Sequence, residues 1–439
     1  MVNRAKKKDA FGLVVLLFCL LCSLPGCGRA GGSRADKTDF TFATWAAGQE
    51  LKDFQAIIDR VNERAGGRYK INVLSIPSDY YIKISTLIAS KKTPDFFWLT
   101  QELISKYAQL GVIADISEPF SRSQILRPEM YYEGVLASAE FGGAHYGLPW
   151  IANPLMVYYN KSLFDEAGIP YPQPQSTWTW DEFIGIAKKL TVIKKDTLGN
   201  DYQQYGCIVD GWPNIETFIW AGGGDIIAKN GLDITLDAEP SLAGLDILHT
   251  ILSEGISPPY AKVASLGSNN VWFEKQRAAM FMGGIQDDFE LKNAAAPDDE
   301  KFGIGYAPMP VGLDGKSWSF DWTASTVLAA GLKDNALAYE ALETVTMAFF
   351  EWKIAPPLKD TLEQVALIEP LKIPALPTMA AVLQSARSAN YVPEWNEINN
   401  LLWVKLYTGM LNDPGFDYHA EAKSIAEQSR KFISARKPQ

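Results

Sequence analysis

The sequence predicts a two-lobed α/β protein in which mostly parallel sheets are flanked by helices. Three observations predict this class. Strand-like and helix-like hydrophobic patterns alternate over residues 39–116. A second alternating region follows the turn Gly147-Leu148-Pro149. The roughly 410 residues that follow the N-terminal segment also exceed one ordinary domain, so two lobes with separate cores are expected.

The first region contains three expected strands, and a helix follows each of the first two. Residues 40–42, 69–73 and 96–99 form apolar or alternating runs that are typical of strands. Apolar residues at helical spacing predict helices over 51–61 and 80–88. This order requires right-handed crossovers, which give a parallel sheet covered on both faces.

Ligands of open α/β sheets bind beyond the carboxyl ends of the strands, and this rule selects residues without any alignment. Trp45 follows the first expected strand, Asp79 and Tyr80 follow the second, and Thr100 and Gln101 follow the third. We expect these five side chains to share one rim of the sheet.

Residues 145–186 are the most informative stretch of the chain. The apolar run Met156–Tyr159 predicts a buried strand, and a short helix should follow it and end at Gly168. Thr179 and Glu182 match a capping box, which predicts the start of a longer helix. The order is therefore strand, short helix, extended loop and long helix.

The N-terminus has the pattern of a signal peptide over residues 1–26. Basic residues precede an apolar run at 11–21, which is too short to span a membrane as a stable helix. The run ends at Leu24-Pro25-Gly26-Cys27, which resembles a lipobox, so we expect cleavage before Cys27 and acylation of its thiol. Residues 27–38 should then be a lipidated flexible tether. A plain secretion signal with an incidental cysteine is the alternative.

Three parts of the 145–186 stretch resemble the signature of a known family: His145–Trp150, Tyr158–Pro170 and Thr179–Phe183. They resemble the carbohydrate-type solute-binding proteins that serve ABC importers, which include maltose-binding-protein-like receptors. The resemblance implies a type II periplasmic-binding-protein fold with its ligand cleft between two lobes. It implies a first lobe of residues 39–150 plus 285–322 and a second lobe of 151–284 plus 323–439. The lobes would close by hinge motion around crossings near 150–153, 283–286 and 322–326.

The same resemblance implies a function and a location. The chain would be a receptor that delivers a mono- or oligosaccharide to membrane permease subunits of an ABC importer. It would be extracytoplasmic and anchored through Cys27, either at the outer face of the cell membrane or in the periplasm. We expect a monomer.

Sugar rings stack on large aromatic rings, and their hydroxyls need groups that donate and accept hydrogen bonds. Tryptophans at expected strand ends, loops or crossings, with polar residues nearby, are therefore candidates, although core packing is the alternative for each tryptophan. Besides the five rim residues, the candidate ligand-binding residues are Trp150, Trp212, Trp220, Gln286, Asp287, Asp321 and Trp322. Residues 283–287 contain no tryptophan where the family often has a stacking aromatic, which leaves the sugar contacts open.

The charge balance excludes some partners. Cleavage after residue 26 would remove four basic residues and Asp9 from the 41 basic and 51 acidic ones, which leaves 37 and 50 and a net charge of −13. No basic stripe stands out, so nucleic acid is not an expected partner. The acidic candidates suit a neutral hydroxyl-rich ligand or a cationic group rather than a phosphate or carboxylate.

Sequence patterns typical of enzymes and metal sites are poor or missing. Gly315-Lys316-Ser317 lacks the first glycine of a phosphate-binding loop, and no Cys/His/carboxylate group has metal-ligand spacing. We therefore expect no enzyme activity, no cofactor and no metal. Two alternatives remain: a ligand sensor or adhesin without transport, and a surface glycosidase, for which adjacent Asp287 and Asp288 would be an unfavourable carboxylate pair.

Overall fold

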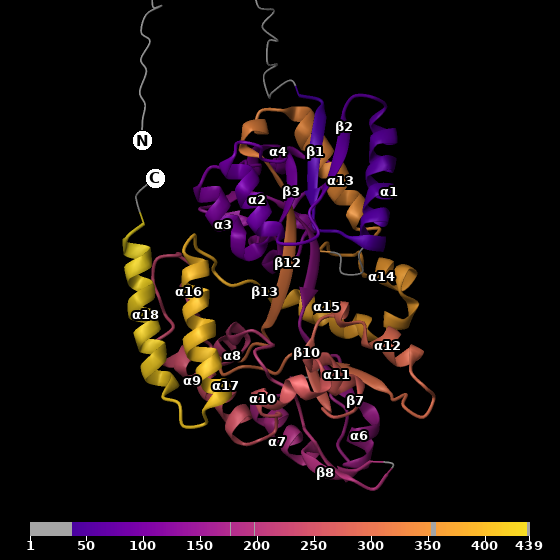
Figure 1. Ribbon diagram of the computed structural model, residues 1–439, viewed down its shortest axis with the longest axis vertical. Helices are drawn as coiled ribbons and strands as arrows, with labels where there is room; N and C mark the ends of the chain where they lie inside the picture. Colours follow the sequence, from indigo (N-terminus) through magenta and orange to yellow (C-terminus); the bar gives the residue numbers. More distant parts are fainter. Residues whose placement is uncertain (1–36, 176, 197, 353–356, 437–439) are drawn as a thin grey trace, which may run out of the picture.

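The computed structural model describes residues 37–436 except 176, 197 and 353–356, and it divides them into two lobes (Figure 1). The predicted signal peptide, Cys27 and the tether up to residue 36 lie outside the described residues. Among the helices of the described part, none is long and apolar enough to cross a membrane.

The first lobe is built on a six-stranded sheet. Strand β1 (Asp39–Thr44) lies between β2 (Lys70–Ser75) and β3 (Phe96–Thr100) and runs parallel to both. This pairing confirms the prediction that the first three strands form a parallel sheet. β12 (Ser319–Leu328) runs antiparallel to β3, and β6 (Leu148–Pro154) and β13 (Ala386–Arg387) pair with β12.

Helices cover both faces of this sheet because side chains alternate between the faces along each strand. Phe42 and Trp98 pack in one core with α1 (Gly48–Ala65) and α13 (Ala336–Phe349). Phe97 and Leu99 pack in a second core with α2 (Tyr80–Ala89) and α3 (Gln101–Gln109).

The second lobe has a smaller sheet, in which β7 (Met156–Asn160) lies between β10 (Met280–Gly283) and β11 (Ile304–Ala307). Both neighbours run antiparallel to β7, so this sheet does not follow the parallel pattern expected from the sequence. Its core includes α7 (Trp180–Leu190), α8 (Ile215–Ala221), α9 (Glu239–Ser253) and α18 (Tyr418–Ser434). The predicted capping box of Thr179 and Glu182 opens α7.

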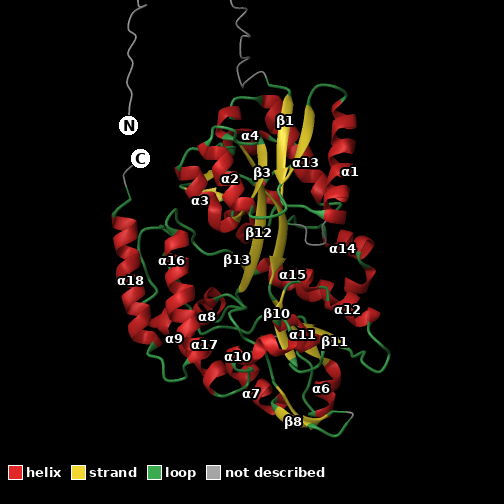
Figure 2. Cartoon of the chain, viewed as in Figure 1, coloured by secondary structure: helices red, strands yellow, loops and turns green. Residues whose placement is uncertain are grey.

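The remaining elements are short (Figure 2). They are α4 (Ser117–Arg122), α5 (Glu133–Ala137), β4 (Glu140–Phe141), β5 (Ala144–His145), α6 (Lys161–Glu166), β8 (Val192–Lys195), β9 (Asp201–Gln204), α10 (Tyr260–Val263), α11 (Asn269–Glu274), α12 (Phe289–Ala295), α14 (Leu362–Ile368), α15 (Leu376–Gln384), α16 (Trp395–Leu401), a π-helix at Leu402–Tyr407 and α17 (Thr408–Asn412).

Strand pairing corrects the predicted lobe boundaries. Residues 285–322 were assigned to the first lobe, but β11 pairs with β7 in the second. Residues 323–349 were assigned to the second lobe, but β12 pairs with β3 and α13 packs on α1 in the first. The predicted crossing near 283–286 is therefore absent from the described residues, because the chain stays in the second lobe after β10. The backbone pairing determines the lobe to which each strand belongs, because the hydrophobic pattern of a strand does not show which sheet it joins.

The antiparallel pair β6 and β12 forms the connection between the lobes. Asp321 lies opposite Pro154, and Trp322 lies opposite Asn153, where the ribbon leaves the large sheet. A third connection runs between α13, which packs on α1, and α15, which packs on β7. The crossings expected near 150–153 and 322–326 thus lie close to this ribbon.

Candidate ligand-binding cleft between the lobes

The carboxyl ends of the first-lobe strands bring aromatic and polar side chains together, as expected from the rule that ligands bind beyond these ends in open α/β sheets. Half-buried Trp45 meets Tyr81 edge to face, with ring centroids 6.5 Å apart. The hydroxyls of Tyr81 and Thr100 lie 3.0 Å apart, and Thr100 donates to the carboxylate of Glu102 at 2.5 Å. Trp45, Tyr81, Thr100 and Glu102 therefore form an aromatic and polar cluster at the carboxyl ends of the first-lobe strands, which is the candidate first-lobe wall of a cleft.

Two predicted site residues of this lobe belong to the core instead. Tyr80 is buried, and its hydroxyl donates to the carbonyl of Ala43 at 3.1 Å and accepts from the amide of Trp98 at 3.0 Å. Trp150 is 2% exposed and stacks on Trp98, with centroids 4.5 Å apart. Asp79 is exposed beside this cluster. It is the N-cap residue of α2 and has a positive φ of 51°.

The candidate for the second-lobe wall is the loop 210–213. Asp210 accepts hydrogen bonds from Asn269 at 3.1 Å and from the amide of Trp212 at 3.3 Å. Half-buried Trp212, which precedes a cis peptide bond to Pro213, donates its indole N–H to the carbonyl of Met282 at 2.8 Å. The predicted residue Trp212 thus lies where the second lobe can face the first.

Helix Leu402–Tyr407 supports this loop and adds an aromatic that the sequence reasoning missed. A Cβ on Gly211, whose φ is +107°, would lie 2.3 Å from the ring of Trp403. The ring therefore rests on the bare backbone of Gly211 while Trp403 stays 42% exposed. The hydroxyl of Tyr407 holds the same loop by donating to the carbonyl of Pro213 at 2.7 Å. The π-helical turn, a type of turn often found at functional sites, carries both residues.

The base of the cleft lies at the connecting ribbon. Asn153 accepts a hydrogen bond from the amide of Gln286 at 3.3 Å. Asp287 accepts from the amide of Gly284 at 2.9 Å and from Asn270 at 2.8 Å, so its carboxylate stabilises the loop. Half-buried Trp322 packs against the cores of both lobes. The structure thus places predicted Gln286, Asp287 and Trp322 around the hinge.

Asp321 is the exception at this base. Its side chain is fully buried in the ribbon. Burial raises the pKa of Asp321 well above its ordinary value, an effect only partly offset by the backbone of Asn153. This carboxyl is held inside the hinge rather than on the cleft wall.

Polar groups of the two lobes meet beside α3. Gln101 accepts hydrogen bonds from the amide and hydroxyl of Thr323, at 2.7 and 2.6 Å, and donates to the hydroxyl of Tyr391 at 3.1 Å. Burial raises the pKa of Glu102. Burial, with smaller contributions from the charges of Asp225 and Glu102, raises the pKa of Glu216 to about 7. Glu102 belongs to α3 of the first lobe and Glu216 to α8 of the second.

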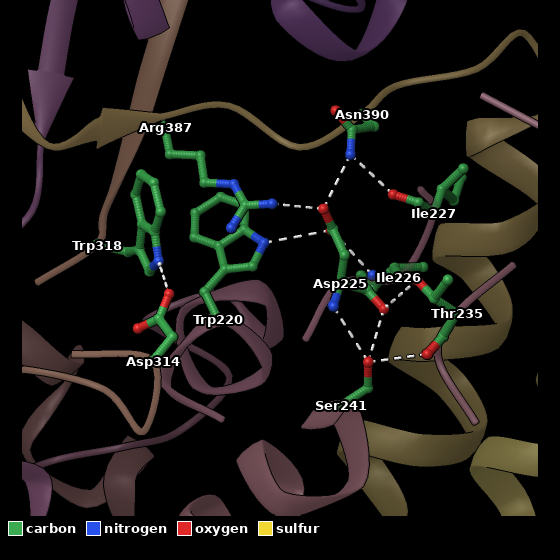
Figure 3. Close-up of polar contacts among 10 residues, drawn as sticks. All are labelled: Trp220, Asp225, Ile226, Ile227, Thr235, Ser241, Asp314, Trp318, Arg387 and Asn390. Atoms are coloured by element: carbon green, nitrogen blue, oxygen red, sulfur yellow. Dashed lines mark hydrogen bonds and ion pairs between the residues drawn. The ribbon is translucent and has the colours of Figure 1, made fainter. Parts of the chain in front are cut away.

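Predicted Trp220 belongs to a different cluster, drawn in Figure 3. The guanidinium of Arg387 lies between the rings of Trp220 and Trp318, at 4.6 and 4.9 Å from their centroids. It pairs with Asp225 at 2.5 Å, and the same carboxylate oxygen accepts from Asn390 at 2.9 Å. Trp220 is buried and stacks on Arg387, so this predicted site residue belongs to the core of the second lobe.

A cavity of about 470 Å³ also lies between the lobes. Trp45, Tyr81, Trp212 and Trp322 are not among its lining residues, so it is separate from the aromatic walls. Its lining comes from the first lobe (Gln101, Ser105, 137, 138 and 140–143) and from the second (229–231, 388–392 and Arg436).

Comparison with known proteins identifies the family of this two-lobed chain. The family described as bacterial extracellular solute-binding protein matches residues 46–349. The chain belongs to this family. Members of the family are binding proteins rather than enzymes, which agrees with the expected class of this solute-binding protein.

Similar proteins cover most of this solute-binding protein. A putative binding protein of Brucella abortus is 23% identical over 87% of the chain and 90% of its own length. The diacetylchitobiose binding protein of Streptomyces coelicolor is 25% identical over 72% of both chains. Among solved structures, the sugar-binding protein MalE of Xanthomonas citri has a TM-score of 0.74 at 20% identity and covers 90% of this chain and 98% of its own. These likenesses confirm the two-lobed fold.

The sequence analysis did not select Tyr81, Glu102, Tyr391 and Trp403, which lie beside the candidate walls or between the lobes. Tyr81 and Glu102 each follow a residue that was selected because it lies just beyond the carboxyl end of a strand. Including one more residue after each of these strand ends would have found them. Tyr391 and Trp403 carry no local signal, because they reach this solute-binding protein's cleft only through the packing of its C-terminal helices.

Proposed function

We propose that this solute-binding protein is the sugar or polyol receptor of an ABC importer and that it closes its two lobes on a mono- or oligosaccharide. The observation that supports this most directly is that each lobe carries partly exposed aromatic side chains next to hydrogen-bonding groups. These aromatics are Trp45 and Tyr81 in the first lobe and Trp212 and Trp403 in the second. Half-buried tryptophans beside carboxylates and hydroxyls suit sugar rings and their hydroxyl groups.

Relatives support the carbohydrate class. The Streptomyces coelicolor relative is a diacetylchitobiose binding protein, and a Pseudomonas aeruginosa relative, 26% identical over 46% of this chain, is a mannitol-binding protein. A Listeria monocytogenes substrate-binding protein with the same fold was solved in complex with cycloalternan. We infer a hydroxyl-rich, uncharged ligand here.

Closure follows from the distribution of contacts. A ligand held by Trp45 and Trp212 together touches both lobes only in the closed state, so its differential affinity shifts the equilibrium toward closure. The closed form would be the one that docks on the permease. We further propose that Cys27 is acylated and anchors a monomeric receptor outside the cytoplasm, and that Asp79, Thr100, Gln286 and Trp322 contribute polar or stacking contacts.

A thermal unfolding screen of the purified protein against sugars, polyols and amino acids tests the ligand class. A ligand at 100 times its dissociation constant should add about 2.7 kcal/mol to the free energy of unfolding. Trp45→Ala and Trp403→Ala should remove the shift produced by the best sugar. Tyr260→Ala is the matched control, because this aromatic is 36% exposed and lies away from the cleft walls. A shift with amino acids alone would contradict the carbohydrate assignment.

A further inference from the structure

The cavity of about 470 Å³ between the lobes is separate from the aromatic walls and has a polar lining of its own. Its volume falls within the range of about 300–1,000 Å³ that is typical of small-molecule sites. The first lobe contributes parts of α3, α5 and the hairpin of β4 and β5, and the second lobe contributes residues 229–231, 388–392 and Arg436. A molecule in this cavity would therefore touch both lobes.

The side-chain amide of Asn390 is held in one orientation. Its nitrogen donates to the carboxylate of Asp225 at 2.9 Å and to the carbonyl of Ile227 at 2.8 Å. Because both partners are acceptors, the nitrogen must face them, and Figure 3 shows the side-chain oxygen of Asn390 on the opposite side. Asn390 lines the cavity, whereas Asp225 and Ile227 do not. The oxygen is therefore the polar atom that this side chain turns toward the cavity, where it is a fixed acceptor.

Arg436 supplies a donor that is fixed in the same way. Its Nε and Nη2 atoms donate to the two carboxylate oxygens of Glu394, at 3.0 and 2.6 Å. This pairing neutralises the guanidinium and leaves Nη1 as a donor on a side chain that lines the cavity. A fixed acceptor and a fixed donor suit hydroxyl groups, because a hydroxyl can donate to the one and accept from the other.

The rest of the lining is uncharged where it is buried and carries both charges where it is exposed. Ser105 and Ser138 are buried, and the half-buried ring of Phe141 offers an apolar face. The exposed side chains of Glu140 and Lys229 come from opposite lobes and have opposite charges. Since the guanidinium of the second lobe is already paired, the lining has no excess charge that would favour an anion or a cation.

We propose that this cavity is a second binding site, distinct from the aromatic walls, and that it takes a neutral polyhydroxylated molecule of the size of one sugar ring. The inference goes beyond the proposed function, because it does not involve the aromatic walls. Hydroxyls of the ligand pair with Asn390 and Arg436, and its C–H face packs on Phe141. Because the ligand contacts both lobes, its binding favours the lobe arrangement in which these groups surround it.

NMR of the protein labelled at alanine and valine methyl groups tests this site, with glucose as the probe. The methyl groups of Ala389 and Val392 line the cavity and report binding there. The titration uses the Trp45→Ala variant, so that glucose at the aromatic walls does not contribute. Both methyl signals should shift saturably. Adding Ala137→Phe should weaken this binding at least tenfold, about 1.4 kcal/mol, because this exposed last residue of α5 lines the cavity and the larger ring would fill it.

Ala89→Phe in the same Trp45→Ala protein is the matched control. Ala89 is the exposed last residue of α2 and is not among the residues that line this cavity. Glucose should therefore shift the two methyl signals as it does without this change. Equal melting temperatures of the two phenylalanine variants without sugar show that Ala137→Phe acts by filling the cavity rather than by unfolding the protein.

Glucuronate and glucosamine add a negative or a positive charge to the same ring, and both should bind in the cavity more weakly than glucose. Tighter binding of either overturns the neutral ligand class and with it the proposal. Methyl shifts that are unchanged by Ala137→Phe, or no saturable shift in the Trp45→Ala protein, also overturn it. These results leave the receptor assignment standing, because calorimetric titration of the wild type and of Trp45→Ala with the best sugar of the screen tests the aromatic walls separately.

Discussion

The side-chain amide of Gln101 donates a hydrogen bond to the hydroxyl of Tyr391, at 3.1 Å, and so joins the first helix turn beyond β3 to the C-terminal part of the second lobe. The carbonyl oxygen of the same amide accepts from the amide and hydroxyl of Thr323 in the connecting ribbon. One buried side chain thus touches both lobes and the hinge. Changes at this position should affect both stability and closure.

Gln101→Ala should lower the free energy of unfolding by about 1–3 kcal/mol, because the buried amide of Thr323 loses its acceptor and the hydroxyl of Thr323 keeps only Ser138 as a partner. Tyr391→Phe removes only the hydroxyl that joins the lobes, so it should alter sugar affinity with little effect on stability. Urea denaturation and calorimetric titration measure the two effects. Gln109→Ala, on the same helix, is the control, and an equal loss of stability in that variant would contradict the assignment.

Glu216 should make stability depend on pH. Its pKa of about 7 in the folded protein lies above the ordinary value of 4.5, so the folded state binds the proton more tightly than the unfolded state. The stabilisation is fully present below about pH 4.5 and is lost as the pH rises to about 7, by a total on the order of 3 kcal/mol. Glu216→Gln should flatten this part of the curve in thermal unfolding measured from pH 4.5 to 8. A slope identical to that of the wild type would exclude Glu216 as its source.

Arg387→Ala should destabilise the protein by about 2–3 kcal/mol, since Asp225 would remain largely buried without its cation. Arg387→Lys should recover part of this loss, because lysine keeps the charge but cannot stack its head group flat between Trp220 and Trp318. Lys316→Ala is the matched control: it removes the cation 5.1 Å from the centroid of Trp318 but leaves Asp225 paired. Chemical denaturation that ranks the lysine variant below the alanine variant would contradict this account.

Gly211→Ala should weaken both folding and sugar binding. The added methyl group would meet the ring of Trp403 at 2.3 Å, and the positive φ adds backbone strain of about 1 kcal/mol or more. Gly199→Ala separates the two causes, because Gly199 has a φ of +83° but open space around the added carbon. Titration with the best sugar from the screen should show loss of affinity in Gly211→Ala alone. Equal affinity in both variants would mean that Trp403 does not contact the ligand.

Acylation at Cys27 is testable in cells. Cys27→Ala should move the protein from the membrane fraction to the soluble fraction and abolish incorporation of labelled palmitate. Cys207→Ala is the control, because that thiol is buried in the folded body. A wild-type protein that is already in the soluble fraction and takes up no palmitate would favour the plain secretion signal.

Local sequence patterns determined the parts of this protein whose causes are local. The alternation of β1, α1, β2, α2 and β3 follows from hydrophobic spacing, and the start of α7 follows from the Thr179–Glu182 capping box. The rim position of Trp45 and Thr100 follows as well, since the carboxyl ends of parallel strands must lie at one edge of a sheet.

Only the tertiary structure determined which sheet β11 and β12 join and which aromatic side chains are buried. Trp45 and Trp150 both flank expected strand ends, yet Trp150 fills a core with Trp98 while Trp45 remains half-buried at the rim. Gln101 and Tyr391 are separated by 290 positions in the sequence and form a hydrogen bond only when the lobes are assembled. Burial and contact between distant segments are properties of the whole packed chain, so the sequence determined the elements and the rim, and packing between the lobes decided the rest of the cleft.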